Sequence, residues 1–252
     1  MASPGIVTTE QWQVMHAWLD QDERAQAAHF LDCEDQRTYV LAHSLRRMGL
    51  SQALKIPVSK VLIASPRAGI PSWQGDHPCP LYFSHAHGRG LAMFAMTGLA
   101  PLGIDVEPLN SAAADLDLLH GWMNLPPVRQ RNAELGPDPA KQFFFFWTVL
   151  EAYWKAAGTG LVEGQALLEC CARGSQGFEV SSTVRGQALR ALAMPLQTPP
   201  GWMASVVTML GDGLDSTFEL PIRYRQIDDF DWDNWGDFAA LRSSHVRQAQ
   251  AA

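Results

Sequence analysis

The sequence contains no long apolar run and little cysteine. None of its 252 residues belongs to an uninterrupted apolar stretch of about 18, the length needed for a membrane-spanning helix. Its start also lacks the basic and then apolar segments of a secretory leader. Its cysteines show no C-x-x-C spacing, which disfavours a zinc knuckle or a disulfide framework. We therefore expect a soluble, cytoplasmic protein with reduced, mostly buried thiols at Cys33, Cys79, Cys170 and Cys171.

Acidic residues are absent from one long segment of a chain that is acidic overall. The formal net charge is −7, which disfavours a general nucleic-acid binder. Residues 36–75 nevertheless contain no Asp or Glu. The basic residues of this segment are Arg37, Arg46, Arg47, Lys55, Lys60 and Arg67. The segment is therefore either a helix with a solvated basic face or a positive surface for phosphates or an acidic partner.

The hydrophobic pattern predicts a mixture of helices and short strands. Helices are expected over about residues 34–50 and 139–157, with a helix-like stretch around residues 118–123. Strands are expected at residues 59–65, 81–85, 90–96, 102–109, 167–172, 177–182, 203–210 and 218–227. An α+β fold of two α/β halves, joined near residues 108–111, would fit this order, although no convincing sequence repeat relates the halves. Residues 228–241 mix aspartates with aromatics and are expected to lie across the surface.

Two acidic side chains share one face of a predicted strand. In residues 102–107, Gly103, Asp105 and Glu107 alternate with apolar residues, so a period of two places both carboxylates on the same face. Like charges at this spacing repel one another unless they are solvated or bridged by a cation. The strand is therefore either a water-facing edge or part of a cation site.

A glutamate and a lysine stand one helical turn apart in residues 146–161, FWTVLEAYWKAAGTGL. As an exposed pair, Glu151 and Lys155 would stabilise a helix by only about 0.2–0.5 kcal/mol. The aromatic and small residues around them leave almost no solvated face, however, so both charges are expected to be partly buried and to need partners. If Glu151 approaches Asp105 and Glu107, three carboxylates could hold a hard divalent cation, for which Mg²⁺ is the natural choice.

A third block, YFSHAHGRG, places Ser84 and His85 at a strand end before a glycine-rich turn. A hydroxyl, an imidazole and turn amides could together bind a phosphate. Adjacent strand residues point to opposite faces, which disfavours a Ser-His hydrolase pair. His85 and His87 share a face and suggest zinc, but no third ligand is evident. Ordinary packing of a histidine is the remaining alternative.

Three blocks together resemble the 4'-phosphopantetheinyl transferases of the monomeric, two-half (Sfp) type. They are FSHAHG at residues 83–88, GIDVE at 103–107 and FWTVLEAYWKAAGTGL at 146–161, and the resemblance extends over about residues 21–161. The chain departs from the family pattern at several positions. Leu150 and Ile70 replace lysines, while Tyr82 and Ala86 replace an asparagine and a serine. Near the N-terminus, Glu23 and Gln26 stand where basic residues are usual, which leaves Arg24 and Arg37 as candidates.

The resemblance implies transfer of the phosphopantetheine arm of coenzyme A to a serine of an acyl or peptidyl carrier protein, with release of 3',5'-ADP. It implies that Asp105, Glu107 and Glu151 hold Mg²⁺, and that Glu151 accepts the serine proton directly or through a water. Lys155 would stabilise the leaving 5'-phosphate. The implied coenzyme A site comprises Arg37, Gly69, Pro71, Ser84, His85, Asp105 and Lys155.

The same resemblance implies a pseudo-duplicated fold with the active site between its halves. Residues 1–108 would form a coenzyme A-binding half, residues 109–225 a half with the catalytic helix, and residues 226–252 a tail on the surface or partly disordered. We expect a monomer that docks its carrier on the basic segment or on the apolar residues Leu118, Leu119, Trp122 and Met123. Two alternatives are a Mg²⁺-dependent phosphodiesterase that uses the same carboxylates and a non-catalytic relative that only binds coenzyme A or carriers.

Overall fold

The computed structural model describes most of the chain outside its ends and several connections. The described residues are 8–64, 72–73, 81–115, 117, 135–159, 169–173, 177–184, 187–211 and 222. Among them are four α-helices, α1 (Thr9–Trp18), α2 (Gln21–Ala28), α3 (Cys33–Leu54) and α6 (Pro139–Ala157), and two short 3₁₀ turns, η2 (Val58–Lys60) and η3 (Ser111–Ala113). The strands in this part of the chain are β1 (Ile63–Ala64), β2 (Ser72–Trp73), β3 (Tyr82–Gly88), β4 (Leu91–Thr97), β5 (Leu102–Pro108), β6 (Glu169–Arg173), β7 (Gly177–Val184), β8 (Gln187–Pro195) and β9 (Trp202–Met209). The mixture of helix and sheet confirms the expected α+β class.

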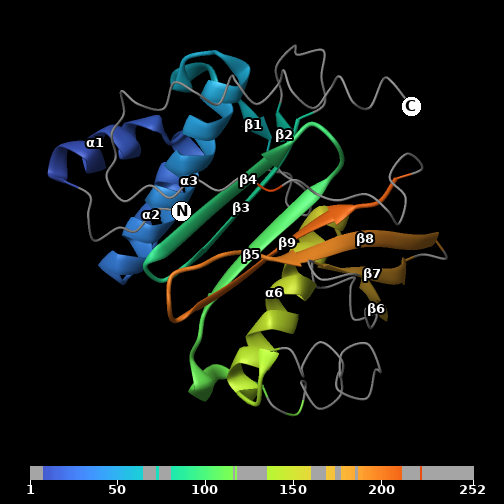
Figure 1. The fold of residues 1–252 in the computed structure, drawn as a ribbon. Helices are drawn as coiled ribbons and strands as arrows, with labels where there is room; N and C mark the ends of the chain where they lie inside the picture. Colours follow the sequence, from blue (N-terminus) through green and yellow to red (C-terminus); the bar gives the residue numbers. More distant parts are fainter. Residues whose placement is uncertain are drawn as a thin grey trace.

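A five-stranded sheet is the largest element of the fold. Its strand order is β5-β9-β8-β7-β6, and every neighbouring pair is antiparallel. The β3–β4 hairpin lies beside β5, as Figure 1 shows, and Ser84 Oγ of β3 accepts a hydrogen bond of 3.2 Å from the Ile104 amide of β5. Strands distant in the sequence therefore meet at β5, the strand that carries Asp105 and Glu107.

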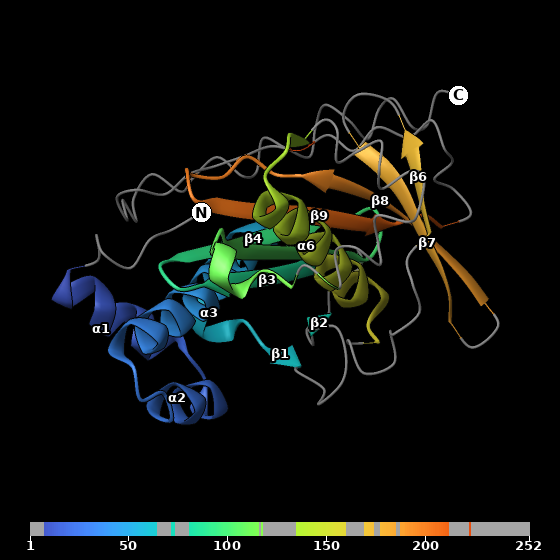
Figure 2. The same ribbon diagram turned by 90° about the horizontal axis from the view of Figure 1, so that it is seen from below.

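Two helices cover the strands. Helix α3 packs on the β3–β4 hairpin, with α1 and α2 against it, whereas α6 packs on β5 and β9 (Figures 1 and 2). The apolar cluster under α6 includes Phe145, Tyr153 and Trp154, together with residues of β7, β8 and β9. A separate cluster joins α1 and α3 to β4. The charged residues of α6 thus lie on a helix whose body is buried, as its sequence predicts.

The ends of α6 follow from local sequence signals. Asp138 caps the first turn by accepting hydrogen bonds from the backbone amides of Ala140 and Lys141, and Pro139 occupies the first turn, where its missing N–H carries no penalty. Gly158 ends the helix with φ of 73°, a left-handed conformation that glycine adopts without strain. The observed span agrees with the predicted one.

Two sequence expectations are wrong or incomplete. Cys33 is exposed at the start of α3, although its thiol was expected to be buried; the first turn of a helix that protrudes beyond its packed face reaches solvent. Strand β8 was not predicted because its segment, QALRALAMP, is rich in alanine and leucine, which favour helix. Pairing with both β7 and β9 overrides that preference. The expected strand at residues 218–227, the helix-like stretch around residues 118–123 and the segment 228–241 lie outside the described residues, apart from isolated positions.

None of the helices in the described ranges is both long enough and apolar enough to cross a membrane.

Candidate functional site

The candidate site is built where β5 and α6 touch backbone to backbone. A Cβ atom at Gly103 would lie 1.9 Å from the carbonyl oxygen of Ala152 and 2.7 Å from the amide nitrogen of Ala156. Only glycine permits so close an approach between a strand and a helix. Asp105 lies two residues along the strand from this contact, and Glu151 and Lys155 lie on the adjoining turns of the helix. The glycine of GIDVE therefore positions the charged residues of both sequence blocks.

Asp105 and Lys155 form an ion pair across this contact. Lys155 Nζ lies 2.5 Å from Asp105 Oδ1 and also donates to the carbonyl oxygen of Ile104 at 3.3 Å. The Asp105 side chain is only 7% exposed, whereas that of Lys155 is 36% exposed. The second carboxylate oxygen, Oδ2, is buried and has no hydrogen-bond partner among the residues that the structure describes. A buried carboxylate oxygen without a partner is unfavourable in the protein alone and available to a ligand.

All three predicted acidic residues have a raised pKa, and the charge of Asp105 contributes to the rise at Glu107 and Glu151. Burial raises the pKa of Asp105, which the nearby Lys155 ammonium partly opposes. Burial and the charge of Asp105 raise the pKa of Glu107 to about 7, and Glu151 adds to the rise. Burial and the charge of Asp105 also raise the pKa of Glu151. The structure thus brings the three carboxylates into one electrostatic group, with a single lysine among them.

Asp105, Glu107 and Glu151 are suitable ligands for a cation, although their side chains are not arranged as a preformed metal site. Over the described ranges, no three side chains of His, Cys, Asp or Glu converge closely enough to hold a metal ion. Lys155 supplies the positive charge beside Asp105 in this conformation. Burial raises the pKa of all three carboxyl groups, and their oxygens offer an all-oxygen donor set, which a hard divalent cation prefers.

Ser84 and His85 occupy opposite faces of β3, as their adjacency predicts. Ser84 is buried toward β5 and accepts the Ile104 hydrogen bond. His85 faces α3, where its ring meets that of His43 edge to face, with centroids 4.9 Å apart. Burial and the positive charge of Arg46 hold the pKa of His85 well below its usual value. This geometry disfavours a Ser84–His85 catalytic pair.

The other residues that the sequence predicts for coenzyme A binding make no described contact with Ser84 or His85. Arg37 is exposed on α3, and no described contact connects it with Ser84 or His85. Gly69 and Pro71 lie outside the described residues. The apolar residues proposed for docking, Leu118, Leu119, Trp122 and Met123, also lie outside them. Their roles stay predictions.

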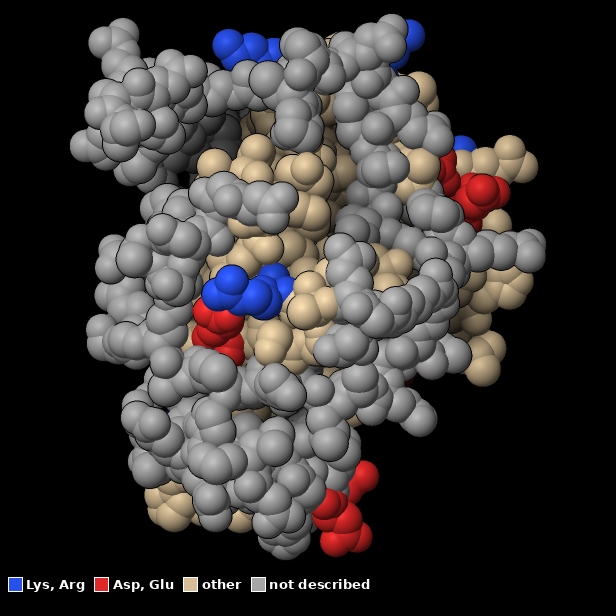
Figure 3. All heavy atoms as spheres, turned by 90° about the vertical axis from the view of Figure 1, so that its right-hand side faces the viewer, with Lys and Arg blue, Asp and Glu red and all other residues tan. Residues whose placement is uncertain are grey.

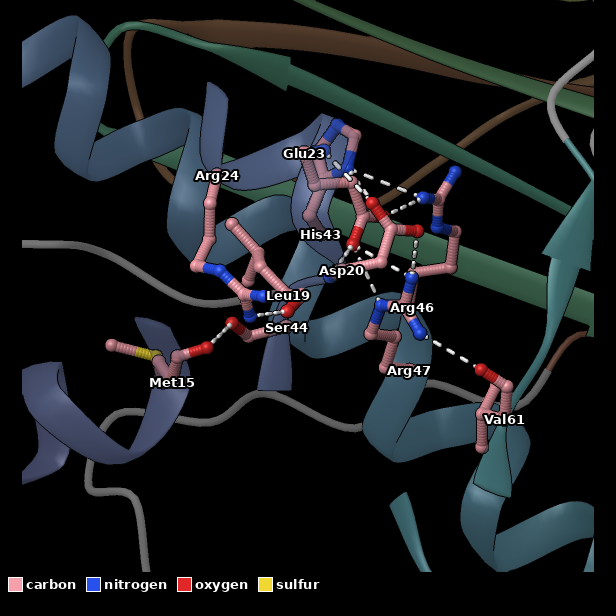
Figure 4. A network of polar contacts seen from close by, with 10 residues as sticks. All are labelled: Met15, Leu19, Asp20, Glu23, Arg24, His43, Ser44, Arg46, Arg47 and Val61. Atoms are coloured by element: carbon pink, nitrogen blue, oxygen red, sulfur yellow. Dashed lines mark hydrogen bonds and ion pairs between the residues drawn. The ribbon is translucent and has the colours of Figure 1, made fainter. Parts of the chain in front are cut away.

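A buried polar network behind His85 was not anticipated (Figure 4). Glu23 of α2 accepts hydrogen bonds from Arg46 and from Arg47 Nε at 2.8 Å, and its Oε1 lies 3.0 Å from His43 Nδ1. Arg47 also pairs with Asp20 at 2.5 Å. Burial by itself would raise the pKa of Glu23, but hydrogen bonds from His43, Arg47 and the Asp20 backbone, together with the charge of Arg46, hold it well below its usual range.

This network bears on both alternatives for residues 36–75, a solvated basic helix face and a positive surface, because it removes Arg46 and Arg47 from either one. Arg46 and Arg47 are only 2% and 4% exposed, because both turn inward to Glu23. The sequence contained one signal for the arrangement, since Asp20 and Glu23 have the spacing of a capping box, which the structure shows at the start of α2. Figure 3 shows a different face, on the right-hand side of Figure 1, where one group of described basic atoms near the middle lies against acidic atoms.

The chain was compared with protein-family models and with known proteins. No protein-family model matches the chain. The chain is 32% identical over 157 residues to the 4'-phosphopantetheinyl transferase HetI of Nostoc sp., an alignment that covers 61% of this chain and 65% of the relative. It is 26% identical over 155 residues to the L-aminoadipate-semialdehyde dehydrogenase-phosphopantetheinyl transferase of Schizosaccharomyces pombe, covering 57% of this chain and 60% of that protein.

The chain thus spans somewhat less than two thirds of the length of each relative, 65% and 60%. Both relatives carry the name of the same kind of transferase, and that kind is the one that the three sequence blocks predict. The predicted resemblance is therefore confirmed: the chain is similar in sequence to 4'-phosphopantetheinyl transferases.

Proposed function

We propose that the chain transfers the 4'-phosphopantetheine arm of coenzyme A to a serine of an acyl or peptidyl carrier protein and releases 3',5'-ADP. The observation that carries the proposal is the contact between Asp105 on β5 and Lys155 on α6, which joins two of the sequence blocks that resemble those of the 4'-phosphopantetheinyl transferases. The charge of Asp105 also acts on Glu107 and Glu151, which supports placing these two carboxylates near the ion pair. Transfer of a charged phosphate ester gains most from such positioned charge.

We assign Asp105, Glu107 and Glu151 as the residues that hold Mg²⁺. The unpartnered Oδ2 of Asp105 and the raised pKa values of all three carboxyl groups favour this assignment, because a divalent cation would relieve their mutual repulsion. Bound there, Mg²⁺ would neutralise the pyrophosphate of coenzyme A and stabilise the departing oxygen.

The protein's own groups have distinct tasks in this proposal. Glu151, whose pKa is raised by burial and by Asp105, accepts the proton of the carrier serine as that hydroxyl attacks phosphorus. Lys155 is the more exposed member of its ion pair with Asp105. Its ammonium group can therefore leave the Asp105 carboxylate and contact the leaving 5'-phosphate. His85, Ser84 and Arg37 bind phosphates of coenzyme A, and Gly69 and Pro71 line the adenine.

The proposed architecture follows the two-half plan. Residues 1–108 form the half that binds coenzyme A, residues 109–225 the half with the catalytic helix, and residues 226–252 a tail. Because β5 pairs with β9 along its whole length, this division lets both halves share one sheet, with the site at their junction. A site completed within one chain is compatible with a cytoplasmic monomer that meets its carrier protein as a separate partner.

The test is intact-mass spectrometry of a panel of apo carrier proteins after incubation with coenzyme A and Mg²⁺. We expect a phosphopantetheine mass gain on at least one carrier, and none with EDTA. Asp105→Ala and Glu151→Ala should each abolish the gain while circular dichroism shows a folded protein. Glu34→Gln, which changes an exposed carboxylate on α3, is the matched control and should transfer normally.

Two outcomes would contradict the proposal in different ways. Release of 3',5'-ADP from coenzyme A without any carrier would indicate a phosphodiesterase. Binding of coenzyme A with no mass gain on any carrier would indicate a non-catalytic binder. Full activity of either alanine variant would remove that residue from the site.

A further inference from the structure

A row of three side chains leads from α2 through α3 to β3. It begins with Glu23, whose Oε1 lies 3.0 Å from Nδ1 of His43. It continues from His43 to His85, whose rings meet edge to face at 80° with centroids 4.9 Å apart. Figure 4 shows the first part of this row, with Glu23 and His43 among the arginines. The row connects the buried network to the histidine that the proposed function assigns to phosphate.

The ring of His43 is held from two sides. Tyr39 stacks on it with centroids 4.0 Å apart and planes 27° from parallel. His85 contacts it edge to face, and the His43 side chain is only 12% exposed. Stacked and edge-to-face contacts are both favourable geometries for aromatic rings. His43 therefore has one well-defined ring position.

The hydrogen bonds also select one tautomer of His43. Arg46 Nη2 lies 3.2 Å from the same Nδ1 that lies 3.0 Å from Glu23 Oε1. A guanidinium only donates and a carboxylate only accepts, so Nδ1 cannot serve both partners at once. Arg46 already donates to Glu23, and we therefore assign the Nδ1 proton to the bond from His43 to Glu23. His43 is thus fixed in orientation and in tautomer.

The charges around the row favour neutral imidazoles. Two carboxylates, of Asp20 and Glu23, balance the guanidinium groups of Arg46 and Arg47. Burial lowers the pKa of His43 despite the bond to Glu23, and burial together with Arg46 and His43 lowers that of His85. Over the part of the chain that the structure describes, no protein group hydrogen-bonds to the His85 ring. Among the described residues, the ring contact that is observed for His85 is the one with His43.

We propose that His43 is a positioning residue for His85: Glu23 fixes the His43 ring, and that ring sets the direction in which His85 presents its nitrogens to a phosphate of coenzyme A. The inference rests on the proposed function, which supplies the phosphate ligand. It adds a residue from α3 that none of the three sequence blocks contains.

The test is a double-mutant cycle on coenzyme A binding, measured by isothermal titration calorimetry. His43→Asn keeps a hydrogen-bond donor for Glu23 but removes the ring. We expect its Kd for coenzyme A to rise about fivefold, an effect in the middle of the range for the loss of one aromatic contact. In a His85→Ala background the same change should have no further effect, because the two residues act through one another. His29→Asn, an exposed histidine at the end of α2, is the matched control and should bind normally.

Restoring the ring distinguishes positioning from general support of the fold. His43→Phe keeps the ring between Tyr39 and His85 but loses the bond to Glu23, so it should recover part of the affinity that His43→Asn loses. The ring ¹⁵N resonances of His85 should shift in His43→Asn and not in His29→Asn. If His43→Asn does not fold, His43→Gln takes its place in the cycle.

The outcomes separate this inference from the proposed function. Wild-type protein that does not bind coenzyme A would overturn the proposed function first. Normal binding by wild type together with additive effects of His43→Asn and His85→Ala would overturn the positioning role alone. An unchanged Kd in His43→Asn would do the same.

Discussion

Replacing Gly103 by alanine should separate β5 from α6 and disturb the site through its backbone. The added Cβ would lie 1.9 Å from Ala152 O, 2.7 Å from Ala156 N and 2.9 Å from Ala152 C. All three are backbone atoms, so no side chain can rotate away. Ordinary contact begins at 3.4 Å, and the strand and helix must therefore move apart by about 1.5 Å (3.4 − 1.9).

The expected loss of stability is at the upper end of what overpacking produces, about 3 kcal/mol. For a chain of this size that corresponds to a fall in Tm of about 6–12 °C. The same movement lengthens the Asp105–Lys155 contact, which is 2.5 Å in the structure. Misplacement of catalytic groups by about 1 Å can lower a rate about 100-fold, and we expect carrier modification to fall by that order.

Thermal unfolding followed by circular dichroism measures the first effect, and the initial rate of mass gain on a carrier, well below the lowered Tm, measures the second. Gly211→Ala is the matched control, because a Cβ at Gly211 meets none of the described atoms within 4 Å. It should change the free energy of unfolding by less than about 0.5 kcal/mol. A Gly103→Ala protein with the Tm and activity of Gly211→Ala would refute the argument that this close approach builds the site.

Three further changes test other parts of the structure. The pKa of Glu107 is raised to about 7, so its contribution to stability is complete below its unfolded value of about 4.5 and is lost as pH rises through about 7. In EDTA, Glu107→Gln should therefore be more stable than wild type above pH 7 and as stable as wild type near pH 4. The expected difference above pH 7 is about 1–2 kcal/mol after discounting for solvent screening. Parallel curves of unfolding free energy against pH for the two proteins would contradict this. Tyr153→Phe removes the hydrogen bond that the hydroxyl donates to Leu189 O at 3.0 Å and the one that it accepts from Ser182 Oγ at 2.8 Å. Urea unfolding should show a loss of about 1–3 kcal/mol, whereas no loss would mean that neither bond contributes. Lys155→Ala should still bind coenzyme A by calorimetry while carrier modification falls steeply, and loss of binding with unchanged turnover at saturation would exclude a role at the leaving group.

Short stretches of sequence determine several features of this protein. The limits of α6 follow from Asp138, Pro139 and Gly158, and the alternation in residues 102–107 identifies β5 and places Asp105 and Glu107 on one face. Caps, breakers and alternation act over a few residues, so one sequence suffices to detect them. The three blocks also sufficed to predict the resemblance to 4'-phosphopantetheinyl transferases, which the curated relatives confirm.

Other features depend on contacts between distant segments. The alanine- and leucine-rich β8 is a strand because β7 and β9 pair with it on both sides, and its own residues do not favour that state. Arg46 and Arg47 point inward because Glu23, more than 20 residues away, accepts their hydrogen bonds. The sign and place of a charge are visible in a sequence, but whether it meets solvent or a buried partner is decided only when helices pack.

The site combines both kinds of determination. The sequence alone determined which residue types are available, namely carboxylates at positions 105, 107 and 151 and a lysine at position 155. Tertiary structure decided that Lys155 contacts Asp105, that Asp105 Oδ2 is buried without a partner, and that His43 packs on His85. The physical reason is that local patterns fix the face on which a side chain lies, whereas distance and burial depend on which other element that face packs against.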